Sequence, residues 1–289
     1  AALAGEASIV LGTRLSIFTP LPRLGLIVVD EEHDASFKQQ DGMRYSARDI
    51  ALVRAQNSHV PVVLGSATPS LESLANVERG KYLRTELRSR AGSAPMPVIE
   101  CLDVRGLELQ AGMSAQLLTA IGDCLKRGEQ VMLFLNRRGY SPLLICRHCG
   151  EPKRCDRCDA FLVYHKGADA ARCHHCDRQW SRQAGARCCE APEIALMGLG
   201  TGKLEEAVAE LFPSARVCRI DRDTVRRKEA LREMLEAINA REVDIIIGTQ
   251  MLAKGLDFSA VTLVGVVDAD SRLYSLDFRA EERLAQLLI

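Results

Sequence analysis

The chain has 289 residues, of which 47% are hydrophobic and 26% are charged, and its formal net charge at pH 7 is zero. This composition is typical of a folded globular protein and excludes a fibrous or intrinsically disordered chain. The sequence has neither a long apolar run nor the layout of a signal peptide, so it predicts a cytoplasmic protein without membrane partners. Because the net charge is zero, any nucleic-acid surface must come from local clusters of Arg and Lys.

Short apolar runs alternate with helical patterns in the first third of the chain. The runs SIVLG (8–12), LGLIVVD (24–30) and VPVVLGSAT (60–68) have the length and the polar flanks of buried strands. The helical patterns between them favour a parallel sheet whose strands are buried on both faces. We therefore predict an α/β lobe over residues 1–88.

The second of these runs ends in Asp30 and is followed by Glu31, Glu32 and His33, and we call these four residues the acidic stretch. The carboxyl end of a parallel strand is where open α/β sheets bind their ligands. An adjacent Asp and Glu there can hold Mg²⁺ through water and orient an attacking water, which is the Walker B arrangement. Since isolated Asp-Glu pairs also occur by chance, this pair alone does not establish nucleotide hydrolysis.

A second group of runs predicts a second α/β lobe over residues 111–145 and 193–289. Its runs are QVMLFLN (130–136), VDIIIGTQ (243–250) and VTLVGVVDAD (261–270). The Pro, Gly and Ser content around RSRAGSAPMPVIE (88–100) indicates a linker over residues 89–110. The chain lacks an initiator Met and ends in an unfinished helical pattern, so we expect it to be part of a longer protein.

A segment rich in Cys, His and Arg, residues 146–192, interrupts the second lobe, and we call it the cysteine module. Its eight cysteines form three C-x2-C pairs and one adjacent pair: Cys146 and Cys149, Cys155 and Cys158, Cys173 and Cys176, Cys188 and Cys189. Each C-x2-C pair supplies half of a tetrahedral site, so the module predicts two structural Zn²⁺ ions. Buried free thiols need an apolar core that this segment lacks, and disulfides are rare in cytosolic chains. Candidates for a local contact face with DNA or protein are His174, His175, Arg178 and Trp180.

Four stretches occur in the order and spacing of superfamily 2 helicase motifs. They are the acidic stretch, LGSATPS (64–70), FLNRRGYSP (134–142) and GTQMLAKGLDF (248–258). Together with RIDRDT (219–224), DFRAEERLAQLL (277–288) and the cysteine module, they resemble the PriA family of replication-restart helicases, also called primosomal protein N′. The resemblance covers nearly the whole chain.

This resemblance implies two RecA-like lobes with a zinc-binding insertion in the second. It further implies an ATP-dependent 3′-to-5′ DNA helicase that recognises stalled forks and promotes reloading of the replicative helicase. The implied cofactors are Zn²⁺ and Mg²⁺ with ATP. The implied partners are forked and single-stranded DNA, primosome proteins and single-stranded DNA-binding protein.

The resemblance also assigns roles to individual residues. Asp30 and Glu31 are implied to be catalytic, with Glu32 and His33 relaying the nucleotide state. The group implied to couple the ATP cleft is Ser66, Ala67, Thr68, Gly248, Thr249, Gln250, Lys254, Gly255 and Asp257. Residues 34–49 are implied to form a loop that senses single-stranded DNA. The implied DNA contacts are Phe37, Lys38, Arg44, Tyr45, Arg48, Asn136, Arg137 and Arg138.

The family nests its zinc sites, which implies an inner site and an outer site. The inner set is Cys155, Cys158, Cys173 and Cys176, and the outer set is Cys146, Cys149, Cys188 and Cys189. Ala186 stands where the family pattern has the first cysteine of the last pair. The outer site is therefore expected to use Cys189 alone or a distorted pair, and to retain zinc less well.

The sequence contains no G-x4-G-K-[ST] loop for ATP phosphates. The resemblance implies that this loop lies upstream of residue 1 and that the arginine-finger motif lies beyond Ile289. We therefore expect no ATP hydrolysis by these 289 residues alone. The alternative is a non-enzymatic, zinc-containing platform for DNA or proteins on a helicase scaffold.

Overall fold

The computed structural model describes residues 1–88, 96–135, 143–165, 170–173, 175–181, 189, 194–197, 200–221, 224–225, 228–249, 252, 258–273 and 277–288. The chain divides into two compact units, residues 1–96 and residues 97–288. The boundary between the units lies within the stretch that the sequence predicts as a linker. Among the described helices, none has the length and apolar character needed to cross a membrane.

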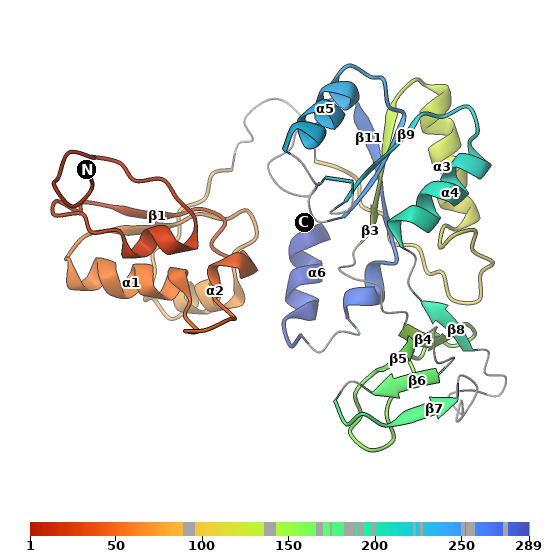
Figure 1. Ribbon diagram of the computed structural model, residues 1–289, viewed down its shortest axis with the longest axis horizontal. Coiled ribbons are helices and arrows are strands. Elements are labelled where there is room, and N and C mark those ends of the chain that lie inside the picture. The colour runs from red at the N-terminus through yellow and green to blue at the C-terminus, as the bar shows by residue number, and fades with distance from the viewer. Residues whose placement is uncertain are drawn as a thin grey trace. The chain divides into compact units, whose positions relative to one another are not determined.

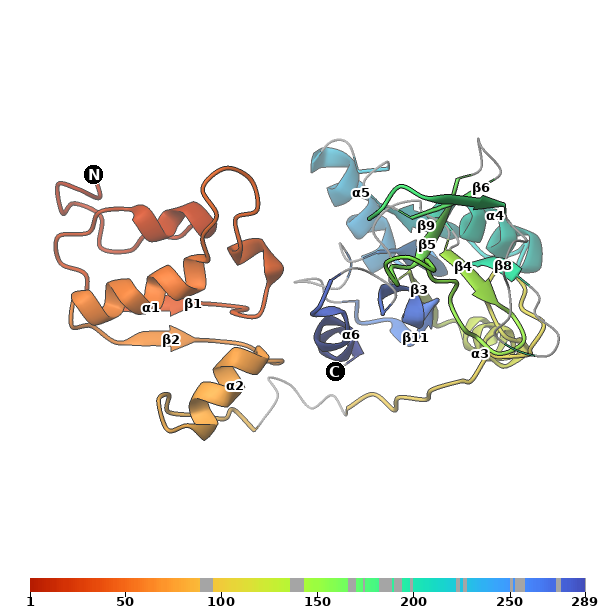
Figure 2. The same ribbon diagram turned by 90° about the horizontal axis from the view of Figure 1, so that it is seen from below.

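Unit 1, residues 1–96, consists of a small parallel sheet with helices beside it. Its elements are η1 (Arg14–Phe18), β1 (Ile27–Val29), η2 (Ala35–Phe37), α1 (Ala47–Asn57), β2 (Val62–Leu64) and α2 (Leu71–Glu78). β1 pairs in parallel with β2, with Val29 opposite Leu64. α1 connects the two strands and lies against both (Figure 2). It buries three alanines spaced four residues apart, Ala47, Ala51 and Ala55.

Two predictions for unit 1 are wrong. Residues 8–12 form no strand, and the side chains of Ile9 and Leu11 are 79% and 92% exposed. A strand needs a neighbour to bond its backbone, and the described sheet of this unit consists of β1 and β2 alone. These two strands are also not buried on both faces, because Val28 and Val63 are 60% and 49% exposed. Among the described residues, α1 covers one face of the β1–β2 sheet, and the opposite face, which carries Val28 and Val63, is exposed.

Unit 2, residues 97–288, is built on a four-stranded sheet in the order β11-β3-β10-β9, in which all neighbours are parallel. The strands are β3 (Gln130–Leu135), β9 (Val217–Ile220), β10 (Ile245–Gly248) and β11 (Val261–Val267). The helices around it are α3 (Ala115–Lys126), α4 (Thr201–Leu211) and α5 (Lys228–Asn239). Figure 1 shows α3 and α4 on one side of this sheet and α5 on the other. The chain continues beyond β11 into η4 (Ala269–Arg272) and α6 (Ala280–Leu288).

Successive side chains of the central strands serve opposite faces of the sheet. Leu133 and Ile247 pack into the cluster that includes residues of α3 and α4. Met132 and Ile246 pack into the cluster that includes Ile238 of α5. β3 and β10 are therefore buried on both faces, which is the reason that their sequences are almost entirely apolar.

The cysteine module, together with residues 143–145 and 194–197 on either side of it, forms a separate antiparallel sheet in the order β7-β6-β5-β4-β8, inserted between β3 and α4. Its strands are β4 (Leu143–Cys146), β5 (Leu162–His165), β6 (Ala170–Cys173), β7 (Gln179–Ser181) and β8 (Ile194–Met197). The entering strand β4 pairs with the leaving strand β8, so the insertion begins and ends at the same place. The fold is thus mixed α/β with parallel sheets and a cysteine-rich insertion, which confirms the predicted fold class.

Candidate functional site

The three C-x2-C pairs lie in turns of the same kind. In each turn, the amide of the residue after the second cysteine donates to the carbonyl of the first cysteine. These bonds are Gly150 to Cys146 at 2.8 Å, Asp159 to Cys155 at 3.0 Å and Asp177 to Cys173 at 2.9 Å. The donating residues have positive φ values of 76°, 59° and 66° in the same order. Gly adopts this left-handed region freely and Asp more readily than most residues, so the sequence suits these turns.

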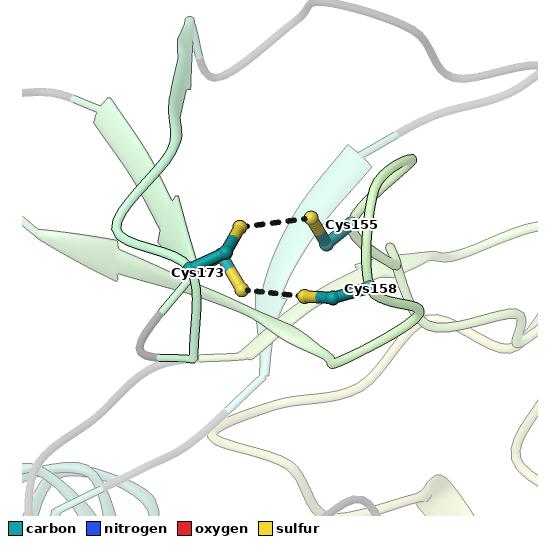
Figure 3. Close-up of side chains that lie close together, drawn as sticks. Cys155, Cys158 and Cys173 are labelled. Carbon is teal, nitrogen blue, oxygen red and sulfur yellow. Dashed lines mark hydrogen bonds between the residues drawn. The ribbon is translucent and has the colours of Figure 1, made fainter.

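Four thiols converge at the inner cluster. The Sγ atoms of Cys155 and Cys176 are 3.5 Å apart and those of Cys158 and Cys173 are 3.3 Å apart. All four lie within 4.8 Å of one another, and Figure 3 shows three of them pointing toward a common centre. A tetrahedral Zn²⁺ ion with bonds of about 2.3 Å places its sulfur ligands about 3.8 Å apart. The cluster therefore fits zinc, whereas a disulfide needs sulfurs about 2.0 Å apart.

The thiols of the inner cluster differ in acidity. Burial acts to raise the pKa of Cys173, but amide donors from Cys176 and His175 outweigh it and lower that pKa to about 6. The Ala160 amide acts to lower the pKa of Cys158, but desolvation and the neighbouring thiols raise it to about 12. Zinc binds thiolates, so the metal competes with protons for these sulfurs.

The outer cluster contains Cys146, Cys149 and Cys189, whose sulfurs also lie within 4.8 Å of one another. The Sγ atoms of Cys146 and Cys189 are 3.7 Å apart. Cys188 lies outside the described residues. The described part of the chain thus supplies three thiols to this cluster, and they belong to the outer set that the family resemblance implies.

The acidic stretch after β1 presents its side chains to different environments. Asp30 and Glu31 are exposed, and Glu31 has a positive φ of 51°. The Glu31 amide donates to Asp30 Oδ1 at 3.0 Å. His33 Nδ1 lies 2.7 Å from Ser66 Oγ, and Ser66 Oγ accepts from the Thr68 amide at 3.0 Å. The residues after β1 are therefore bonded directly to Ser66, Ala67 and Thr68 after β2, which we call the SAT sequence.

Glu32 is buried, with only 2% of its surface exposed. Its Oε1 accepts from the Ser70 amide at 2.6 Å, and its Oε2 accepts from Ser70 Oγ and from Arg48 Nη1, both at 3.0 Å. Because a buried carboxylate is stable only when its charge and its oxygens are paired, these bonds fix the position of Glu32. Glu32 thus joins β1, α1 and the N-terminus of α2, and it acts as a positioning residue.

The sequence predicts that Arg48 meets DNA phosphate, and this prediction does not fit the geometry. The guanidinium of Arg48 donates to Glu32, Ser70 Oγ and Asp49, and its side chain is 16% exposed. Burial acts to lower the pKa of Arg48, but its bonds to Glu32 and Asp49 raise it. The charge of Arg48 is used inside unit 1, because it balances the buried Glu32 carboxylate.

The predicted DNA-sensing loop covers residues 34–49. Residues 34–46 precede α1, and the last three residues belong to that helix. An antiparallel bridge between Lys38 and Ser46 closes the loop, and Gln39 N donates to Tyr45 O at 2.8 Å. Lys38 and Arg44 are exposed and Phe37 is half-buried. Tyr45 packs edge-on against Phe18 of η1, with ring centroids 5.1 Å apart. The loop therefore exposes the cations of Lys38 and Arg44, while Tyr45 anchors its base against Phe18.

Most of the remaining predicted site residues lie outside the described residues. These are Asn136, Arg137, Arg138, Gln250, Lys254, Gly255 and Asp257. Gly248 ends β10, and a Cβ atom there would lie 2.2 Å from Leu252 Cδ1 and 3.0 Å from Ile220 O. Thr249 O accepts from the Leu252 amide at 2.9 Å. A larger residue at the start of this motif would therefore force Leu252 to move and would crowd the Ile220 carbonyl.

The cysteine module and the whole chain match known proteins. Residues 155–179 match the family model described as the PriA DNA helicase Cys-rich region (CRR) domain. The whole chain is 49% identical to the replication restart protein PriA of Haemophilus influenzae. The chain belongs to the PriA family. It covers 40% of that relative, and it covers 36% of the PriA proteins of Bacillus subtilis and Synechocystis, to which it is 42% and 45% identical.

The Glu32 contact in this PriA-family chain leads to a prediction for Ser70→Ala. Ser70 caps α2, accepting from the Ser73 amide, and also donates to the buried Glu32 carboxylate. Losing a cap and a donor to a buried charge is expected to destabilise α2 by about 2 kcal/mol.

Ser114→Ala is the matched control, because Ser114 caps α3 by accepting from the Leu117 amide. It is expected to cost α3 about 1 kcal/mol. Amide hydrogen exchange of α2 and α3 measures both effects, and equal losses would contradict the role of Glu32.

Proposed function

We propose that this chain carries part of the motor of an ATP-dependent 3′-to-5′ DNA helicase that acts at stalled replication forks and promotes reloading of the replicative helicase. The proposal rests first on membership of the PriA family, whose matched relatives are named replication restart proteins. The observation that carries it is the acidic stretch, in which exposed carboxylates at the end of β1 are bonded through His33 to the SAT sequence after β2.

Each acidic side chain has a distinct role in this proposal. Asp30 directs Oδ1 to the Glu31 amide, which holds the carboxylate at the end of the strand. Mg²⁺ bound with ATP supplies positive charge that stabilises the phosphates. The exposed Glu31 carboxylate orients the attacking water and accepts its proton, while the buried Glu32 holds the surrounding segments in place.

Coupling between nucleotide and DNA follows from the contacts on either side of the acidic stretch. His33 contacts Ser66, and Ser66 in turn holds the Thr68 amide, so a shift of the acidic stretch moves the SAT sequence. The loop over residues 34–46 follows His33 directly and presents Lys38 and Arg44 to solvent. Cations at this position bind the phosphates of single-stranded DNA. DNA held by the loop thereby acts on the residues that surround Asp30 and Glu31.

The second candidate is a non-enzymatic zinc platform that binds DNA or replication proteins. It is favoured by the completeness of the inner thiol cluster. Against it stands the His33 bond to Ser66, since a passive scaffold has no need for a contact that joins these two motifs.

The test uses the complete protein in which this sequence occurs. ATP hydrolysis is measured with and without single-stranded DNA, and strand displacement is measured on duplexes with a 3′ or a 5′ single-stranded tail. The motor proposal predicts hydrolysis that DNA stimulates and displacement that requires the 3′ tail. Tight binding to forked DNA with no stimulated hydrolysis would favour the zinc platform, and displacement from the 5′ tail would contradict the proposed direction.

A further inference from the structure

Three ion pairs surround the inner thiol cluster, and we call them the arginine-aspartate girdle. They are Arg154 with Asp159 at 3.2 Å, Arg172 with Asp177 at 2.6 Å and Arg178 with Asp156 at 3.0 Å. Arg172 binds both carboxylate oxygens of Asp177, since its Nε also donates to Oδ1 at 2.9 Å. Such two-point contacts are among the better-defined ion pairs at a protein surface.

Two of the pairs occupy equivalent positions in the two inner turns. In both, the arginine directly precedes the first cysteine and the aspartate directly follows the second, giving the pattern R-C-x2-C-D at residues 154–159 and 172–177. The third pair crosses between the turns, because Asp156 lies in the first and Arg178 follows the second. The outer turn has Ile145 and Gly150 at the corresponding positions and so lacks this pair.

The position of each aspartate explains why a pair is useful there. Asp159 and Asp177 have left-handed φ values, a conformation that costs a residue other than glycine some free energy. Their amides must keep this conformation to bond the carbonyl of the first cysteine in each turn. An arginine that holds the carboxylate therefore holds the turn, and with it the spacing of the two sulfurs.

The arginines are themselves held by aromatic rings. The guanidinium carbon of Arg154 lies 4.5 Å from the centroid of the Phe161 ring, and that of Arg178 lies 5.6 Å from the centroid of the Trp180 ring. Both distances fall within the range of a cation-π contact. A Zn²⁺ ion with four thiolates has a net charge of about −2, so nearby guanidinium groups also stabilise the loaded site.

We propose that the girdle residues are positioning residues of the inner metal site, which slow the loss of Zn²⁺ by holding both inner turns closed. Their arginines then serve the metal site and are not the phosphate contacts that an exposed basic cluster suggests. Among the described residues, the Cys146 turn of the outer site has no such pair and so lacks this restraint. This inference concerns metal retention and does not depend on the proposed helicase activity.

The test measures Zn²⁺ release from the complete protein into a chromophoric chelator. Trp180 is the chain's one tryptophan and packs against the core that contains Cys155 and Cys173, so the release phase that changes its fluorescence belongs to the inner site. Asp177→Asn keeps the shape of the side chain and a residue type suited to left-handed backbone, but removes the charge. We expect Asp177→Asn and Arg172→Gln each to speed this phase about two- to fivefold at low salt. The difference from the unmodified protein should shrink at high salt, because salt screens exposed pairs.

Three comparisons make the result decisive. Arg157→Gln removes the same charge from an exposed arginine of the first inner turn that has no ion pair within the described residues, so it should leave the phase unchanged. The double variant of Arg172 and Asp177 should release Zn²⁺ no faster than either single variant, because both remove the same contact. Unchanged release in the single variants overturns the proposal. So does an unchanged phase accompanied by a weaker affinity of Arg172→Gln for forked DNA, since that outcome makes the arginine a nucleic-acid contact.

Discussion

Replacing Glu31 with glutamine is expected to lower DNA-stimulated ATP hydrolysis by the complete protein about 100-fold or more. The size of the effect is that of removing a general base from its place beside the reacting water. Glutamine has the shape of glutamate but cannot accept the proton. Affinity for ATP should change little, because Asp30 remains, the carboxylate that we propose to hold Mg²⁺ through water.

Because Glu31 is exposed, its replacement is expected to change hydrolysis without changing the stability of the fold. Its side chain is 56% exposed, and the one ion pair of its carboxylate among the described residues is with His33 Nδ1, 3.5 Å away. Glu31→Gln should therefore fold normally, which thermal unfolding can verify. Glu32→Gln offers a contrast, because Glu32 is buried among Ser70 and Arg48, and its replacement should lower stability as well as activity.

Glu78→Gln provides the matched control. Glu78 is an exposed glutamate at the end of α2, in the same unit as Glu31, and its loss should leave hydrolysis unchanged. Equal rates for Glu31→Gln and the unmodified protein would contradict the catalytic assignment. If such a protein also kept its affinity for forked DNA, the zinc platform would be the better reading of the chain.

The sequence predicts the central elements of unit 2 because their burial leaves a direct mark on composition. β3 and β10 are covered on both faces and are therefore apolar at nearly every position. The run at residues 8–12 has a similar composition but is exposed. An apolar run therefore forms a strand only where a neighbouring strand can bond its backbone, and a short run does not encode which distant segment supplies that neighbour.

The metal site is predictable because its signal is local. Two residues between cysteines suffice to place both sulfurs on one side of a turn, so spacing alone indicates the ligands. The pattern R-C-x2-C-D of the girdle also occurs twice in the sequence, but the pattern alone does not show that each arginine pairs with its aspartate. The contacts of Arg48 cannot be predicted from local sequence, because Glu32 lies 16 residues away and Ser70 lies 22 residues away in the chain.

Complete removal of Zn²⁺ is expected to unfold the cysteine module while the parallel sheet of unit 2 remains folded. The described residues of the module form one small buried cluster of six residues, two of which, Cys155 and Cys173, belong to the inner thiol cluster. Without metal these thiols contribute little to the free energy of folding, whereas Zn²⁺ binding at a structural site contributes about 10 to 16 kcal/mol to it. The parallel sheet has two apolar clusters of its own and needs no metal ligand.

The measurement combines fluorescence of Trp180 with hydrogen exchange after treatment with a strong chelator. Trp180 emission should shift to longer wavelength as the ring enters water, and amides of β5 and β6 should lose protection while those of β3 and β10 keep it. Cys155→Ser should reproduce the change without a chelator, because it removes one of four inner ligands. Cys101→Ser should have no effect, because Cys101 is exposed and belongs to neither cluster. If β5 and β6 stay protected once all metal is gone, the module is held by its apolar core, and the thiol clusters are not its main source of stability.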